Sequence, residues 1–310
     1  MTLTMNTELI LETQGLTKRL GGKPVVNGVN LQIGRGDIYG FLGPNGAGKT
    51  TTIRMLLGLA RPTNGAIRIF GKDIRKERLA ILRKVGSLVE YPSYYGHLNA
   101  VENLEAVRRL LPGVPKSRID EVLSIVRLTN DARRAVKGYS LGMKQRLGIA
   151  TALLGDPELL ILDEPTNGLD PAGIQEIREL IKSLPKTSGV TILISSHLLS
   201  EVEQMATRVG IIAKGNLIYQ DSIERLREQA QGRIRLGVSD PESAWQMLLS
   251  YGYPAEWDRS KLTVGQTDDR TVASIVSRLV NHHFQVYRVE EEHASLESIF
   301  LEMTGSEGSL

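Results

Sequence analysis

The stretch Gly43-Pro-Asn-Gly-Ala-Gly-Lys-Thr50 follows an apolar segment, 37–43, and leads into a segment, 49–59, whose apolar residues recur at helical spacing. It matches the pattern G-x-x-x-x-G-K-[ST] in the strand–loop–helix context that a phosphate-binding loop requires. The backbone N–H groups of such a loop, together with the positive end of the helix, bind phosphate oxygens. The sequence therefore predicts a nucleoside triphosphate site here rather than a chance glycine-rich turn.

Two side chains of this loop have specific expected roles. Lys49 reaches the β and γ phosphates, and the Thr50 hydroxyl is a ligand of magnesium. The residues expected to bind the nucleotide here are Gly43, Pro44, Asn45, Gly46, Ala47, Gly48, Lys49, Thr50 and Thr51.

A second apolar strand ends in two acids, in the stretch Leu159-Leu-Ile-Leu-Asp163-Glu164. Acids often finish strands, so this pattern is informative only beside the phosphate-binding loop. Asp163 is placed to hold magnesium, usually through water, and Glu164 to accept a proton from an attacking water molecule. The two motifs together predict hydrolysis of a bound triphosphate.

The remaining pattern predicts an α/β protein with a mainly parallel sheet. Buried strands are expected at 190–194 and 208–213, with helices at 174–184 and 199–205 between them. The N-terminal part, 9–33, is expected to be antiparallel. A composition shift after residues 231–232 marks the start of a small accessory α/β domain of about 75 residues.

Composition excludes several classes of protein. The 310-residue chain has length for about two domains. It has no cysteine, which rules out disulfides, thiolate metal sites and cysteine nucleophiles. With 38 Lys+Arg against 35 Asp+Glu the formal charge is only +3, so no nucleic-acid partner is expected. Neither a secretory signal nor an apolar run of membrane-spanning length is visible.

These motifs, with Tyr139-Ser-Leu-Gly-Met-Lys-Gln-Arg146 and the segment around His197, resemble the ATP-binding subunit of an ABC transporter over roughly residues 9–225. The resemblance implies a phosphate-loop ABC ATPase domain at 9–230. That domain has a mainly parallel sheet, an antiparallel N-terminal β subdomain and a helical insert at about 91–150. The small α/β domain follows at 233–310.

The resemblance also assigns residues that act across a dimer. The family signature, usually Leu-Ser-Gly-Gly-Gln, corresponds here to Tyr139–Met143, so the in-trans residues are Ser140, Leu141, Gly142 and Met143. Ser140 can cap the helix that follows and direct its hydroxyl and free N–H groups outward. The alternative is an ordinary N-capped helix with no ligand.

Two further positions carry roles over from the family. Asp170, in Asn167-Gly-Leu-Asp170, matches the loop that communicates between the two subunits. His197 matches the switch histidine that contacts the γ phosphate. A single histidine at a strand end is usually structural, and the other motifs make it a ligand here.

The sequence departs from the family pattern at two positions. Glu90 stands where relatives have glutamine, and a carboxylate there can still contact magnesium. The alternative is a solvated acid in a turn. Glutamate at this position resembles exporters of the lantibiotic and bacitracin type. Leu20 stands where relatives place an aromatic residue against adenine. The base is therefore expected to rest on aliphatic surface, with Leu20 and Val25 as its contacts and Val26 as the alternative to Val25.

We therefore expect an ATPase that uses ATP and magnesium to energise a separate integral-membrane permease. Export of an antibiotic, an antimicrobial peptide or a lipid-like compound is the expected process. A single phosphate loop requires a homodimer, or a pair with a similar subunit, at the cytoplasmic side of the cell membrane. The alternatives are a soluble ABC-type ATPase acting on ribosomes or DNA, and a nucleotide-binding module without turnover.

Overall fold

The structure is a computed structural model of the 310-residue chain, and it describes residues 8–89, 94–229, 233–258, 261–265, 267–292 and 296–304. The chain divides into two compact units, Met1–Ile223 and Glu224–Leu310. The limits expected from the sequence for the two domains and for the helical insert remain predictions.

The first unit contains an antiparallel sheet built mainly from the N-terminal segment. Its order is β2-β1-β5-β6, and β3 also pairs with β1. The expected hairpin forms between β1 and β2, where Gly21 and Gly22 both have positive φ. The strands are β1 (Leu9–Leu20), β2 (Lys23–Val29), β3 (Gln32–Gly34), β5 (Asn64–Ile69) and β6 (Lys72–Asp73).

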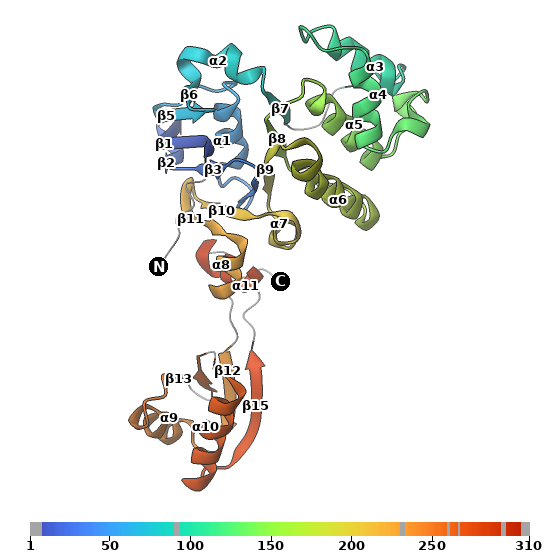
Figure 1. Ribbon diagram of the computed structural model, residues 1–310. Helices are drawn as coiled ribbons and strands as arrows, with labels where there is room; N and C mark the ends of the chain where they lie inside the picture. The colour runs from blue at the N-terminus through green and yellow to red at the C-terminus, as the bar shows by residue number, and fades with distance from the viewer. Residues whose placement is uncertain are drawn as a thin grey trace. The chain divides into compact units, whose positions relative to one another are not determined.

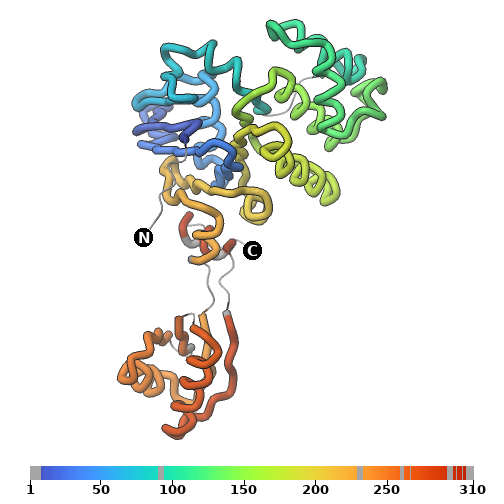
Figure 2. Tube along the Cα trace, in the orientation of Figure 1, coloured from blue at the N-terminus to red at the C-terminus, as the bar shows by residue number. Residues whose placement is uncertain are grey.

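The second sheet of this unit has the order β11-β10-β4-β9-β8-β7 and is parallel except for the pair β10–β11. Figure 2 shows residues near 210 lying beside the N-terminal quarter of the chain, as the β4–β10 pairing requires. Every residue of β4, β8 and β9 is buried, which is why these strands read as apolar runs. The strands are β4 (Ile38–Leu42), β7 (Val85–Leu88), β8 (Leu159–Asp163), β9 (Thr191–Ser196), β10 (Arg208–Ala213) and β11 (Asn216–Ser222).

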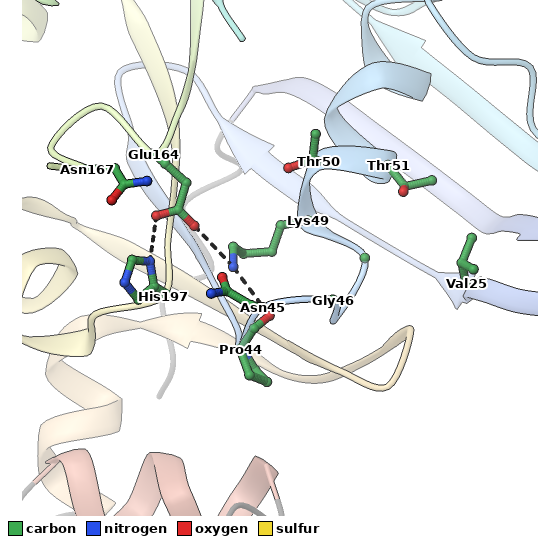
Figure 3. A pocket seen from close by; sticks show the side chains of 11 residues that line it. Val25, Pro44, Asn45, Gly46, Lys49, Thr50, Thr51, Glu164, Asn167 and His197 are labelled. Atoms are coloured by element: carbon green, nitrogen blue, oxygen red, sulfur yellow. Dashed lines mark hydrogen bonds and ion pairs between the residues drawn. The ribbon is translucent and has the colours of Figure 1, made fainter. Parts of the chain in front are cut away.

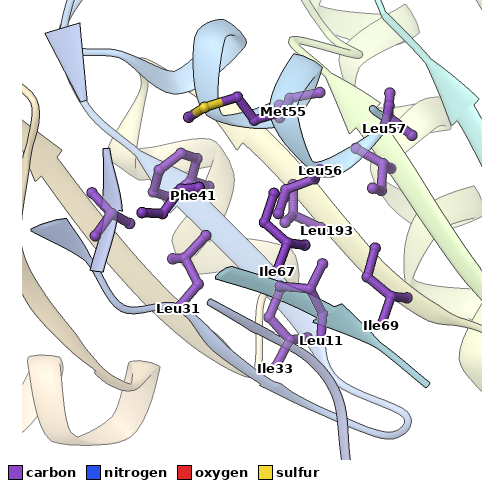
Figure 4. Close-up of a cluster of buried hydrophobic side chains, with 14 of the residues drawn as sticks. Leu11, Leu31, Ile33, Phe41, Met55, Leu56, Leu57, Ile67, Ile69 and Leu193 are labelled. Carbon is purple, nitrogen blue, oxygen red and sulfur yellow. The ribbon is translucent and has the colours of Figure 1, made fainter. Parts of the chain in front are cut away.

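Helix α1 (Lys49–Leu56) joins the two sheets through one hydrophobic core (Figure 4). Its Met55 and Leu56 belong to the same cluster as Leu11 of the antiparallel sheet and Phe41 of the parallel sheet. Burial on both sides fixes the helix, and therefore the loop before it, relative to the ends of β4, β8 and β9.

The other helices of this unit include a group formed by α3, α4 and α5, which lies beside β7 and β8 in Figure 1. Helix α6 has clear sequence limits, because Asp170 caps its N-terminus, Pro171 is its first residue and Gly189 ends it with a φ of 64°. The helices are α2 (Ile74–Leu82), α3 (Ala100–Arg108), α4 (Ser117–Ile125), α5 (Leu141–Leu153), α6 (Pro171–Ser188) and α7 (Leu199–Met205), with short 3₁₀ turns at Thr129–Asp131 and Val136–Gly138.

The second unit contains a four-stranded antiparallel sheet in a β-α-β-β-α-β chain order. Its strand order, β13-β14-β12-β15, is that of the ferredoxin-like fold. Helices α9 and α10 pack on one face through Leu248 and Ile275. The elements are α8 (Ile223–Gln229), which begins at the division, then β12 (Arg233–Val238), α9 (Pro241–Ser250), β13 (Ala255–Asp258), β14 (Lys261–Val264), α10 (Asp269–Asn281), β15 (Val286–Glu292) and α11 (Leu296–Thr304).

Candidate functional site

The loop between β4 and α1 has the backbone shape that its glycines predict. Gly48 caps α1 with a φ of 111°, and a Cβ added there would lie 2.7 Å from the carbonyl oxygen of Val25. Gly46 also has positive φ. Because a side chain at Gly48 would be both strained and blocked, only glycine allows this loop to approach the β1–β2 hairpin so closely.

Lys49, the first residue of α1, is only 5% exposed. Its ammonium Nζ donates to the carbonyl oxygen of Gly43 at 2.6 Å and lies 3.2 Å from Oε1 of Glu164 (Figure 3). The loop thus holds the cation at the point where a bound phosphate chain would need it.

Glu164 follows β8 directly and has an unusual backbone conformation, with a φ of 50°. Its backbone N–H donates to Oγ of Ser195, on β9, at 3.0 Å. While Oε1 faces Lys49, the other carboxylate oxygen, Oε2, lies 2.7 Å from Nδ1 of His197. Figure 3 shows the Glu164 carboxylate between the ammonium group of Lys49 and the imidazole ring of His197.

Asp163 is the last residue of β8 and is 5% exposed. The hydroxyl of Ser195 donates to its Oδ1 at 2.5 Å, because Asp163 and Ser195 are register partners on adjacent parallel strands. No cluster of three acidic, histidine or cysteine side chains that could hold a metal occurs among the described residues. Magnesium fits nevertheless, since it is usually held by one or two carboxylates with substrate phosphates and water, and Asp163 and the Thr50 hydroxyl supply hard oxygen atoms.

Lys49, Glu164 and His197 line a cavity of about 420 Å³. In Figure 3, Val25 lies at the opposite end of the cavity from His197. The lining residues are Val25, Pro44, Asn45, Gly46, Gly48, Lys49, Thr50, Thr51, Glu164, Asn167 and His197. The phosphate loop, Glu164 and His197 therefore form one site of the kind that binds nucleoside triphosphates, while Asp163, the residue before Glu164, does not line the cavity.

Some predicted residues lie elsewhere. Gly43 and Ala47 belong to the loop without lining the cavity, although the Gly43 carbonyl accepts from Lys49. Leu20 ends β1, is 54% exposed and does not line it either. Glu90 lies outside the described residues.

The residues expected to act in trans are at helix N-termini away from the cavity lining. Ser140 caps α5 as predicted, its hydroxyl accepting from the N–H of Met143 at 3.2 Å, and it is exposed. Leu141 is 40% exposed and Gly142 is half-buried. Asp170 caps α6 by accepting from the N–H of Gly173 at 3.2 Å. None of the four signature residues lines the cavity of its own chain.

Sequence reasoning missed the role of Ser195 and the place of Asn167 in the cavity wall. Asn167 follows Glu164 closely enough for its turn to return to the cavity, and its N–H donates to the Glu164 carbonyl. A signal for Ser195 existed: polar residues ending two strands of a parallel sheet meet at the same edge.

Several known proteins resemble this chain. Residues 26–167 match the ABC transporter family. The bacitracin transport ATP-binding protein BcrA of Bacillus licheniformis is 52% identical over 235 residues, covering 76% of this chain and 77% of that protein. BcrA of Enterococcus faecalis is 40% identical over 302 residues, covering 97% and 98%. The lantibiotic transport ATP-binding protein SrtF of Streptococcus pyogenes is 47% identical over 228 residues, covering 73% and 97%.

Solved structures show the same fold. An ATP-binding subunit of an ABC transporter superposes with a TM-score of 0.63 at 29% identity, covering 71% of this chain and 92% of that one. CbiO1 of Clostridium perfringens, part of the ABC transporter complex CbiONQ, gives 0.64 at 26% identity, covering 78% and 95%.

The chain therefore belongs to the ABC transporter family, as an ATP-binding subunit. It is an ATPase coupled to transport, and the fold class expected from the sequence is confirmed. Within the described residues, no helix is both long enough and apolar enough to cross a membrane.

Proposed function

We propose that this subunit hydrolyses ATP on a separate membrane permease to export an antimicrobial peptide of the bacitracin or lantibiotic class. The likeness to two bacitracin transport subunits, one of them over nearly its full length, and the likeness to a lantibiotic transport subunit support this substrate class. The position of Glu164 between Lys49 and His197 is the single observation that carries the hydrolytic mechanism.

The chemistry assigned to these side chains is in-line attack of water on the γ phosphate. Glu164 Oε2 accepts the proton of that water, and His197, held against the same carboxylate, contacts the γ phosphate. Lys49 stabilises charge on the β and γ phosphates, while the loop N–H groups orient them. Thr50 and Asp163 would hold magnesium, which supplies neutralisation of charge on the phosphates, and Glu90 is its further expected contact.

A complete site takes two copies of the chain in this proposal. The exposed N-terminus of α5, with Ser140, Leu141, Gly142 and Met143, lines no part of its own cavity and is free to face a partner's nucleotide. We assign communication between the two sites to Asp170, which caps the neighbouring helix α6. A homodimer, or a pair with a similar subunit, satisfies this requirement.

A groove of about 410 Å³ beside β7, α3 and α5 is the proposed docking place of the permease. Its exposed apolar and aromatic members include Leu59 and Tyr95, which are 64% and 61% exposed. An exposed polar residue, Ser87, accompanies them, as is usual at the edge of a surface where a protein partner binds. Docking there would place the chain peripherally at the cytoplasmic side of the cell membrane.

The test compares purified subunit–permease complexes in lipid with bacitracin, a lantibiotic or an unrelated cationic drug added. We expect the two peptide classes to stimulate ATP hydrolysis, and Leu59→Glu to abolish complex formation while the isolated subunit still binds ATP. Stimulation by none of the peptides would contradict the substrate class. Co-sedimentation of the chain with ribosomes or DNA would favour the soluble alternative, which the transport names of the relatives do not support.

A further inference from the structure

Glu201, on α7, is a buried carboxylate for which the hydrolytic mechanism above has no use. It is 6% exposed, and its Oε2 accepts from the hydroxyl of Thr166 at 2.5 Å and from that of Ser196 at 3.2 Å. Thr166 is 4% exposed and Ser196 is 2% exposed. Within the part of the chain that the structure describes, the carboxylate is thus held by hydroxyl groups and forms no ion pair.

Stability gives no reason for an acid at this place. Removing a carboxylate from water is costly, and hydroxyl donors compensate the cost less well than a paired cation does. The neighbouring residues Leu199, Val202 and Met205 on the same helix are buried and apolar, so an apolar side chain would suit this environment. The carboxylate instead connects two specific segments.

Those two segments carry the working side chains of the cavity. Thr166 lies two residues after Glu164 and one before Asn167, while Ser196 immediately precedes His197. The turn after β8 and the end of β9 are therefore joined through one carboxylate behind the cavity, and Glu201 itself does not line it. The contact that depends most on this spacing is the 2.7 Å approach of Glu164 Oε2 to His197 Nδ1.

We propose that Glu201 is a positioning residue for hydrolysis: it holds the 164–167 turn against residues 196–197, so that Glu164 and His197 meet in the geometry that the reaction needs. The proposal rests on the proposed roles of Glu164 and His197. Small displacements of reacting groups reduce rates strongly, so loss of this connection should lower kcat by about 10- to 100-fold.

The first experiment compares Glu201→Ala with Glu201→Gln. The glutamine carboxamide oxygen can still accept from both hydroxyls, so we expect kcat within about threefold of the unchanged protein; Glu201→Ala should show the full loss expected from misplacement. The ATP dissociation constant should change little in either, because the phosphate loop is not contacted. Glu203→Ala, which removes another acid from α7, is the matched control and should retain kcat.

A second experiment separates positioning from a general loss of structure. His197→Ala is measured in the unchanged protein and in the Glu201→Ala background. If Glu201 acts through the Glu164–His197 contact, His197→Ala should cost at least about tenfold less in the second background, because coupled residues are non-additive. Independent, multiplicative effects would overturn the proposal, as would equal losses in Glu201→Gln and Glu201→Ala.

Thr166→Val provides the same information if Glu201→Ala does not fold. It removes one hydroxyl donor with little change of shape, and we expect a smaller fall in kcat that is not additive with His197→Ala. Additivity there would also overturn the proposal. Failure of the proposed function is recognised separately. Normal turnover of Glu164→Gln would show that Glu164 is not the base, whatever the effect of the Glu201 variants.

Discussion

Nζ of Lys49 lies 3.2 Å from Oε1 of Glu164, so the cation expected to bind phosphate contacts the carboxylate expected to activate water. The Lys49 side chain is 6% exposed and that of Glu164 is 22% exposed. A triphosphate entering the cavity competes with Glu164 for this ammonium. Nucleotide binding and release of the base are therefore linked through one ion pair.

We expect Glu164→Gln to retain ATP binding and to lose steady-state hydrolysis. A positioned general base contributes about 10²- to 10⁴-fold, and an uncharged carboxamide cannot accept the proton. Phosphate release in the steady state and equilibrium binding of ATP give the two readings, and size-exclusion chromatography with ATP should show an accumulated dimer. Near-normal turnover of the variant would show that another group is the base.

Mixing two inactive variants should restore hydrolysis if the signature residues act in trans. In a heterodimer of Lys49→Ala with Ser140→Arg, one composite site has both defects and the other has neither. Differently tagged chains, purified through both tags, establish that heterodimers are present before activity is measured. Activity no higher than that of either parent would contradict a site shared between two copies.

Discrimination between ATP and GTP should be weak. The cavity's aliphatic end is formed by Val25, and Leu20, where an aromatic residue would stack on the base, is 54% exposed. Stacking contributes about 0.5–1.5 kcal/mol beyond buried area, which is roughly two- to tenfold in affinity.

Competition binding of both nucleotides to the unchanged protein and to Leu20→Tyr measures this effect. GTP should compete within about an order of magnitude of ATP, and Leu20→Tyr should tighten ATP binding by a factor similar to the stacking contribution. Exclusion of GTP by roughly a hundredfold, with no gain in the variant, would mean that another residue recognises the base.

Helix α3 should contribute a pH-dependent stability through Glu105. Hydrogen bonds from Arg108 and then Arg109 lower the pKa of this half-buried carboxyl from its ordinary value of 4.5 to about 2. A lowered pKa means that the stabilisation is complete above the unfolded value and is lost as the pH falls from about 4.5 towards 2.

Urea unfolding of the unchanged protein and of Glu105→Gln, at pH 7 and at steps down to pH 3, tests the sign of this effect. The variant should be the less stable at pH 7, and the difference between the two proteins should shrink as the pH falls. A difference that stays constant over this range would contradict it.

The sequence predicted those elements whose pattern is local. Three such features can be recognised from only a few residues each: the strand ending at Asp163, the glycine loop before Lys49 and the serine cap at Ser140. The structure confirms all three as local structure. Strand β13 was missed, because its Glu256-Trp-Asp258 is short, charged and exposed at a sheet edge. Weak burial leaves no alternation to detect.

The contacts between distant segments could not be predicted in the same way. Ser195 reaches Asp163 only because β8 and β9 are neighbours in a particular register, and Thr166 reaches Glu201 only because α7 packs behind that edge. Strand order is a property of the whole sheet, while a sequence pattern reports on one strand at a time. Which partner each of these hydroxyl groups contacts is therefore seen only in the structure.

The pairing of Arg233 with Glu292 has a practical meaning for the second unit. Arg233 is the first residue of β12 and Glu292 is the last residue of β15. The first and last residues of the four-stranded sheet are therefore paired, about 5 Å apart as is usual in an antiparallel pair. A module with such closely spaced ends can be excised, exchanged or grafted with a very short replacement segment, and the flanking helices α8 and α11 need not be redesigned. This topology makes residues 233–292 a unit that can be replaced as a whole.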